Sequence, residues 1–111
     1  MVNNKIKEIV SIFAKEAQSI YGSKLNGIIL YGSCARGDNA ADSDIDILLL
    51  LSVAPEEIGN ERNKIFDISD ELDLKYDVVL APVFQSVDTY NKYMQVSAFY
   101  QNIQREGVRI A

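Results

Sequence analysis

The apolar run Ile45–Leu51 is the strongest constraint on the fold, because its side chains are apolar on both faces apart from Asp46. Such a segment suits a central strand of a sheet. Asn26–Tyr31 is a second short apolar run, rich in β-branched residues, and predicts a buried neighbouring strand. We expect a third strand at Lys75–Leu80, ended by Pro82.

Helical patterns surround these strands. Apolar residues recur at three- and four-residue spacings over Asn4–Tyr21, and Gly22 is placed to end that helix. Pro55 suits the first position of a second helix that runs to Leu72. We also expect helices at 86–93 and 97–106, a Gly107 cap and an extended tail at 108–111. The pattern predicts one α/β (α+β) domain over residues 1–111, with a small mixed β-sheet and helices packed on one face.

Composition excludes several classes of protein. The 111 residues carry a net charge of −5, which disfavours direct nucleic-acid binding through a broad phosphate contact. The absence of histidine removes zinc–histidine sites and Ser-His-Asp chemistry. A single cysteine, Cys34, rules out an intrachain disulfide and favours a reducing compartment. With no signal-peptide core and no apolar run long enough for a membrane span, we expect a cytoplasmic protein.

An acidic cluster leads into the Ile45–Leu51 segment. Asp44 and Asp46 are two residues apart, so their carboxylates point to the same side of a strand. Asp38 and Asp42 lie close in sequence, and Arg36 is the only basic residue between Ser33 and Ser52. Neighbouring like charges disfavour ionisation, and a bound divalent cation relieves the repulsion. Hard oxygen ligands at this density predict Mg²⁺, with Asp44 and Asp46 as its ligands.

Gly32-Ser33 follows the first expected strand and could open a helical turn. Glycine lets a phosphate approach the backbone, and N–H groups at a helix start bind anions. We therefore take Gly32, Ser33, Arg36 and Ser43 as candidate nucleotide-binding residues. Arg36 could instead brace the acidic loop, and Ser43 is also typical of a turn residue. Cys34 is better explained as a small packed residue than as a nucleophile.

Asp77 interrupts the third expected strand, where an unpaired carboxylate would be costly. If that strand lies beside Ile45–Leu51, Asp77 completes a three-carboxylate site. It would then accept the proton of an attacking hydroxyl or help to hold one of two metal ions. The alternative is an acid on an edge strand that simply faces water.

The string G-S-C-A-R-G-D-N-A-A-D-S-D-I-D from Gly32 to Asp46 resembles the signature of the MNT (minimal nucleotidyltransferase) domains of the DNA polymerase beta-like superfamily. The resemblance covers nearly the whole chain, including D-V-V-L from Asp77 and the segment from Phe99 to Val108. It implies a nucleotidyltransferase fold, with Gly32 and Ser33 at the triphosphate, Asp44 and Asp46 at Mg²⁺, and Asp77 as the third carboxylate. The implied reaction is transfer of a nucleotide, AMP from ATP, to an acceptor.

Small members of this family pair with HEPN-type toxins, and the resemblance implies an antitoxin that adenylylates such a partner. Two alternatives remain: a non-catalytic module that neutralises a partner by contact, and a transferase for a small molecule such as an aminoglycoside. Because larger relatives carry an added domain for the base or acceptor, we expect a partner protein or a second copy of the chain to complete the site.

Overall fold

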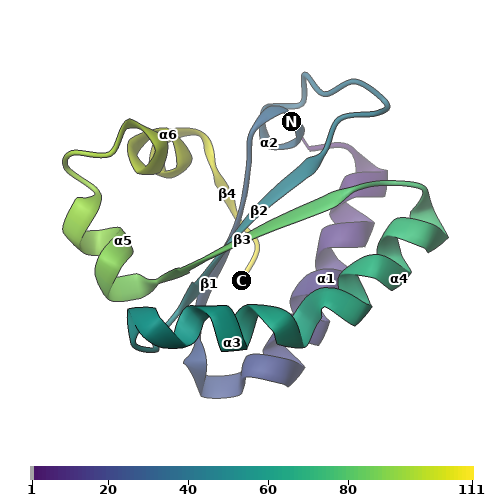
Figure 1. The fold of residues 1–111 in the computed structure, drawn as a ribbon. Helices are drawn as coiled ribbons and strands as arrows, with labels where there is room; N and C mark the ends of the chain where they lie inside the picture. Colours follow the sequence, from purple (N-terminus) through teal and green to yellow (C-terminus); the bar gives the residue numbers. More distant parts are fainter. Residues whose placement is uncertain (1) are drawn as a thin grey trace.

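The computed structural model describes residues 2–111 and shows a four-stranded sheet in the order β3-β2-β1-β4. The strands are β1 (Leu25–Tyr31), β2 (Ile45–Leu51), β3 (Leu80–Ser86) and β4 (Val108–Arg109). β2 runs antiparallel to β1 and parallel to β3, and β4 pairs antiparallel with β1. The sheet is therefore mixed and β2 is central, as its apolar sequence predicts, so the expected fold class is confirmed (Figure 1).

The larger core lies on the face of the sheet to which Ile45, Ile47, Leu49 and Leu51 point. Helix α1 (Asn4–Tyr21) covers this face with Ile9, Phe13 and other apolar residues at helical spacing. Asn3 begins α1 by accepting a hydrogen bond from the Ile6 N–H at 2.9 Å, and Gly22 ends it with a positive φ of 54°.

The segment after β2 is a broken helical run beside α1 on the same face. It consists of η2 (Pro55–Glu57), α3 (Ile58–Arg62), η3 (Asn63–Ile65) and α4 (Phe66–Tyr76). The predicted helix from Pro55 therefore extends four residues beyond Leu72. Both Leu72 and Tyr76, one helical turn apart, pack on the larger core, which favours helix over strand at Lys75 and Tyr76.

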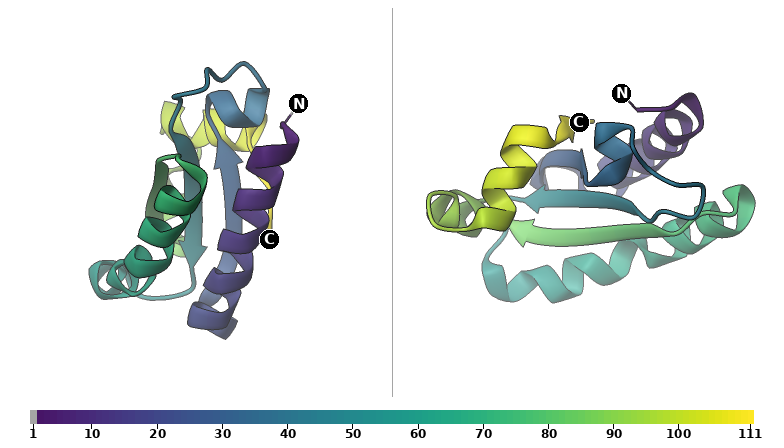
Figure 2. Two further views of the ribbon diagram at one scale, coloured as in Figure 1. Left: turned by 90° about the vertical axis from the view of Figure 1, so that its right-hand side faces the viewer. Right: turned by 90° about the horizontal axis from the view of Figure 1, so that it is seen from above.

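The second face of the sheet is half covered. Leu48 and Leu50 point to this side and form a smaller core with Tyr90 and Ile103. These two residues come from α5 (Val87–Tyr93) and α6 (Ala98–Glu106), which begin at the N-caps Ser86 and Ser97. Figures 1 and 2 show α5 and α6 on the opposite side of the strands from α1 and α4. Helices thus pack on both faces, whereas the sequence predicted one covered face.

The third predicted strand, Lys75–Leu80, is wrong. Asp77 has φ 53° and ψ 55°, a left-handed conformation that ends α4, and the strand begins three residues later. β3 passes through Pro82 because it is an edge strand. The Ile45 N–H donates to the Val79 carbonyl, which shows that the backbone of Val79 faces β2. Because the backbone hydrogen-bonding groups of successive residues face opposite sides of a strand, the nitrogen of Pro82 points away from β2. A missing N–H costs no ladder hydrogen bond at that position.

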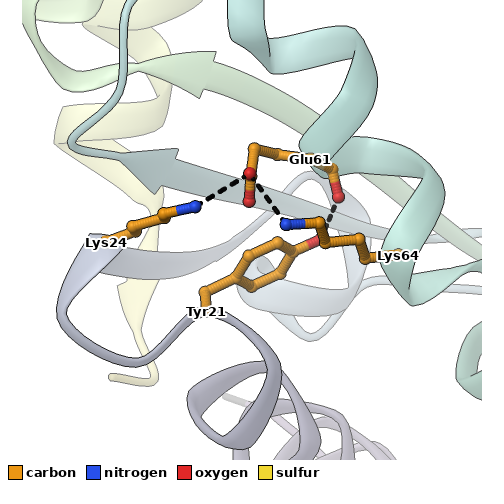
Figure 3. Close-up of polar contacts among 4 residues, drawn as sticks. All are labelled: Tyr21, Lys24, Glu61 and Lys64. Atoms are coloured by element: carbon orange, nitrogen blue, oxygen red, sulfur yellow. Dashed lines mark hydrogen bonds and ion pairs between the residues drawn. The ribbon is translucent and has the colours of Figure 1, made fainter.

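A buried carboxylate joins α3 to the end of α1 (Figure 3). Glu61 is 5% exposed, and its Oε1 accepts hydrogen bonds from Lys24 Nζ at 3.0 Å and Lys64 Nζ at 2.9 Å. Its backbone carbonyl accepts a 2.7 Å hydrogen bond from the Tyr21 hydroxyl. The pKa of Glu61 is lowered, chiefly by the hydrogen bond from Lys64. Burial and the charge of Glu61 raise the pKa of Tyr21 to about 12.

We expect Glu61→Gln to reduce the free energy of unfolding near pH 7 by about 1–2 kcal/mol, since both lysines are half exposed and partly screened. Because the folded-state pKa is lowered, the ion pairs stabilise the fold above the ordinary value of 4.5 and are lost as pH falls through the folded value. Urea unfolding between pH 7 and pH 3 measures this difference.

The difference between the wild-type protein and Glu61→Gln should shrink steadily as pH falls below about 4.5. Glu57→Gln, an exposed acid in the same helical run, is the matched control and should follow the wild-type curve. A difference for Glu61→Gln that is independent of pH would contradict the assignment.

Candidate active site

The site lies where β1 ends and β2 begins. Antiparallel register places Tyr31 opposite Asp46, so the turn that follows Tyr31 lies directly beside the Asp46 side chain. Gly32 then begins α2 (Ser33–Arg36), a single helical turn. The first N–H groups of a helix have no acceptor within it, so those of Ser33 and Cys34 are available at this point. The predicted juxtaposition of Gly32-Ser33 with the aspartate pair is thus formed.

Position 32 requires glycine for two reasons: its backbone conformation and the closeness of Asp46. Its φ is 75°, a conformation that side chains rarely adopt, and a Cβ built there would lie 2.5 Å from Asp46 Oδ2. The carboxylate of Asp46 therefore fills the space that any other residue would need.

Asp44 and Asp46 act on one another electrostatically. Asp46 is half-buried on the second face of the sheet, and its pKa is raised by burial first and then by the charge of Asp44. Asp44 is exposed, and its backbone carbonyl accepts a 3.5 Å hydrogen bond from the Cys34 thiol. The surroundings thus disfavour the charged form of Asp46, which a cation at the pair would reverse.

Cys34 acts as a packing residue, as the sequence analysis favoured. Its side chain is 1% exposed and belongs to the larger core. Burial, with the negative charge of Asp46, raises the pKa of the thiol, which makes it a poor nucleophile. The hydrogen bond of Cys34 to the Asp44 carbonyl fixes the start of β2 against α2.

Arg36 and Ser43 both brace the acidic loop. Arg36 forms ion pairs of 3.2 Å with Asp38 and with Glu106 at the end of α6. The Ser43 hydroxyl accepts from the Ala40 N–H at 2.9 Å, and the Ser43 N–H donates back to the Ala40 carbonyl at 3.1 Å. These contacts match the turn interpretation of Ser43 and the bracing interpretation of Arg36.

Asp77 does not join the aspartate pair in the way the sequence predicted. It is exposed at the end of α4 and lines a cavity of about 410 Å³ together with Asp42 and Ser43. The β3 residue opposite Asp46 is Ala81, so the adjacent strand brings no carboxylate to that position. Within residues 2–111, no three acidic, histidine or cysteine side chains come together as a metal site. The expected three-carboxylate centre is therefore not formed.

Sequence reasoning missed Asp73, which lies one helical turn before Asp77. Its Oδ1 accepts a 2.9 Å hydrogen bond from the Leu80 N–H, which joins α4 to the first residue of β3. Burial raises the pKa of Asp73, and the charges of Asp70 and Asp44 add to this effect. Nothing in the sequence distinguishes Asp73 from the other acids of α4, because its partner is set by the chain reversal at Asp77.

Aromatic residues border the other side of the site. The Tyr31 ring meets Phe99 of α6 edge to face, with centroids 5.6 Å apart, and Phe99 remains 47% exposed. Tyr31, Gly32, Arg36 and Phe99 share a small cavity of about 120 Å³ with Asn102 and Glu106. The aromatic pair therefore forms a wall between the glycine turn and α6.

The two aspartates fit a magnesium–nucleotide complex better than a free metal. Mg²⁺ in proteins is commonly held by one or two carboxylates together with substrate phosphates. Asp44 and Asp46 supply two such ligands, and the adjoining N–H groups suit the phosphates. A mixed sheet that carries this pair beside a glycine-serine turn is the arrangement that the resemblance to the nucleotidyltransferases implies.

The chain belongs to the nucleotidyltransferase domain family, whose model matches residues 7–107, and it is a nucleotidyltransferase. It is 35% identical over 106 residues to a Methanocaldococcus jannaschii protein named a putative protein adenylyltransferase, covering 96% of this chain and 99% of that one. A second protein of that name and organism is 34% identical over 101 residues, covering 91% and 93% of the two chains.

The fold resembles that of a chain in a crystal structure of a toxin-antitoxin with AMP-PNP. The TM-score is 0.58 at 17% identity, and the match covers 91% of this chain and 72% of the other. At that identity the likeness supports the fold alone. Within residues 2–111, no helix is both long and apolar enough to cross a membrane.

We expect Gly32→Ala to slow nucleotidyl transfer by about 100-fold, because the added Cβ displaces the Asp46 carboxylate by roughly 1 Å. The initial rate of transfer measures the loss. Gly59→Ala is the matched control, since nothing lies within 4 Å of a Cβ there and its φ is not positive. If Gly32→Ala retained the wild-type rate, the close packing of Asp46 against this turn would have no catalytic importance.

We expect Asp46→Asn to raise the melting temperature at pH 7 in the absence of Mg²⁺. The pKa of Asp46 is raised in the fold, so its ionised form destabilises the protein above the ordinary value of 3.8, and the gain should vanish as pH falls below it. Mg²⁺ with ATP should raise the melting temperature of the wild-type protein but not that of the variant. Asp42→Asn, at an exposed loop position, is the control; an equal gain in that variant would contradict the assignment.

Proposed function

We propose that this chain is a Mg²⁺-dependent adenylyltransferase that moves AMP from ATP to a hydroxyl of a partner protein. The observation that carries the proposal is the carboxylate pair Asp44 and Asp46, held against the Gly32-Ser33 turn. The likeness to adenylyltransferases over nearly their full length supports a protein acceptor.

In this proposal, each part of the site has a separate task. Asp44 and Asp46 hold Mg²⁺, which neutralises phosphate charge and lowers the pKa of an oxygen that it binds. The N–H groups of Ser33 and Cys34 and the Ser33 hydroxyl bind the terminal phosphates. Arg36 keeps α2 in place through Asp38 and Glu106 and remains a candidate phosphate contact.

The reaction forms a bond between the acceptor oxygen and the α-phosphorus and breaks the bond from that phosphorus to the bridging oxygen of pyrophosphate. A base must take the acceptor proton. With Asp46 engaged by Mg²⁺ in this proposal, the task falls to a group outside the aspartate pair. Asp77 remains a candidate third carboxylate, but it would have to approach from the end of α4 rather than from a strand.

The partner we propose is a HEPN-type toxin, so that the chain acts as an antitoxin. The fold is shared with a chain of a toxin-antitoxin crystallised with AMP-PNP. Val79 and Val83 lie on the β3 side of Asp46 and Phe99 lies on the β1 side, and all three are at least 40% exposed. An apolar rim beside a charged centre suits a protein acceptor.

We expect the chain, incubated with Mg²⁺ and a HEPN-type protein encoded beside it, to transfer label to that protein from ATP labelled at the α-phosphate but not at the γ-phosphate. Asp44→Asn and Asp46→Asn should each reduce labelling by at least about 100-fold, and EDTA should abolish it. Asp88→Asn, an exposed acid of α5, is the matched control and should label the partner normally.

Other outcomes would replace the proposal with one of its rivals. If Asp44→Asn neutralised the partner fully while no label transferred in any sample, the chain would be a binding module. If label appeared on an aminoglycoside such as kanamycin but not on the partner, the acceptor would be a small molecule.

A further inference from the structure

A second cavity lies on the face of the sheet covered by α5 and α6, away from the aspartate pair. Its volume is about 400 Å³, within the usual range for small-molecule sites. Ile29, Leu50 and Ile103 give it an apolar floor. Asp46 and Leu50 are four residues apart on β2, a separation of about 13 Å. Leu48 and the smaller core fill the space between them.

Arg109 supplies the one charged side chain of this cavity. It lies on β4 opposite Ile29, and its guanidinium crosses β1 at Gly27, where a Cβ would come within 2.9 Å of Nη2. Nη2 also donates a 2.6 Å hydrogen bond to the Asn26 carbonyl. Arg109 is exposed, and this hydrogen bond places its guanidinium at the wall of the cavity, where its other N–H groups make no hydrogen bond to residues 2–111.

The charge of Arg109 is not matched by a nearby acid. No salt bridge between described residues includes Arg109, and no aspartate or glutamate lines the cavity. The local environment at Arg109 thus favours an anion.

Polar side chains around the cavity also have unused hydrogen-bonding groups. Tyr90 lines the cavity and is 6% exposed, yet its hydroxyl makes no hydrogen bond to any residue from 2 to 111. The side-chain amides of Asn91 and Gln104 line the same cavity and are likewise unpaired within that range. The Tyr90 hydroxyl reaches solvent, and Asn91 and Gln104 are exposed, so all three can exchange water for a ligand.

We propose that this cavity binds a small organic carboxylate with an apolar body. The carboxylate pairs with Arg109, the apolar part lies on Ile29, Leu50 and Ile103, and Tyr90 and the two amides supply hydrogen bonds. The site is separate from the nucleotide site and does not depend on which acceptor the enzyme uses. Ile103 lines both this cavity and the small cavity beside Gly32, so α6 forms a wall of each.

The test titrates benzoate into the isotopically labelled full chain and follows backbone and side-chain amide shifts by NMR. We expect saturable shifts at Asn91, Gln104 and Arg109 with a Kd on the order of 1 mM. Benzamide, which has the same shape without the charge, should bind about tenfold more weakly. Arg109→Gln should also weaken benzoate about tenfold, whereas Arg105→Gln on the exposed side of α6 should leave its Kd unchanged.

Asn91→Leu provides an independent variant if Arg109→Gln fails to fold, because it removes a hydrogen-bonding group from the lining and retains the charge. It should raise the benzoate Kd while shifts caused by Mg²⁺ and ATP at Gly32 and Ser33 stay as in the wild-type protein. Equal binding of benzoate and benzamide, or benzoate shifts confined to other parts of the chain, would overturn the inference. Because binding is measured directly, the result is independent of whether the chain adenylylates a protein.

Discussion

The packing of the Asp46 carboxylate against the Cα of Gly32 is the contact on which the site depends. It arises because the antiparallel register of β1 and β2 places Tyr31 opposite Asp46. The turn after Tyr31 therefore packs against the Asp46 carboxylate. Only glycine accommodates both the positive φ at this position and the lack of space for a Cβ beside Asp46. One close approach thus fixes the direction of α2 and the position of the aspartate together.

The half-covered second face of the sheet follows from the same arrangement. Along β2, the residues that point to this face change from Asp46 to Leu48 and Leu50. The apolar half is covered by α5 and α6, while the acidic half remains accessible, since burying two carboxylates without a cation would be costly. The sheet face is thereby divided between an acidic end and a packed end, and the Arg109 cavity opens within the packed end.

The stability of the fold and the chemistry of the site make opposite demands on acidic residues. Glu61 is buried with Lys24 and Lys64, and its pKa is lowered, so its charge is favourable in the fold. Asp46 is half-buried beside another acid, and its pKa is raised, so its charge is unfavourable until a cation binds. An electrostatically unfavourable charge of this kind is typical of functional sites, where a bound ligand can compensate it.

The sequence by itself determined the local features. It predicted α1, both inner strands, the helices α5 and α6 with the Gly107 cap, the packed state of Cys34 and the closeness of Gly32, Ser33, Asp44 and Asp46. These depend on periodicity, capping and short separations along the chain. Only the tertiary structure decided the place of Asp77, the entry of Pro82 into a strand, the role of Asp73 and the partners of Arg36. Each of these depends on which strand lies at the edge, where α4 reverses, and which distant helix packs nearby, and no local pattern encodes those long-range contacts.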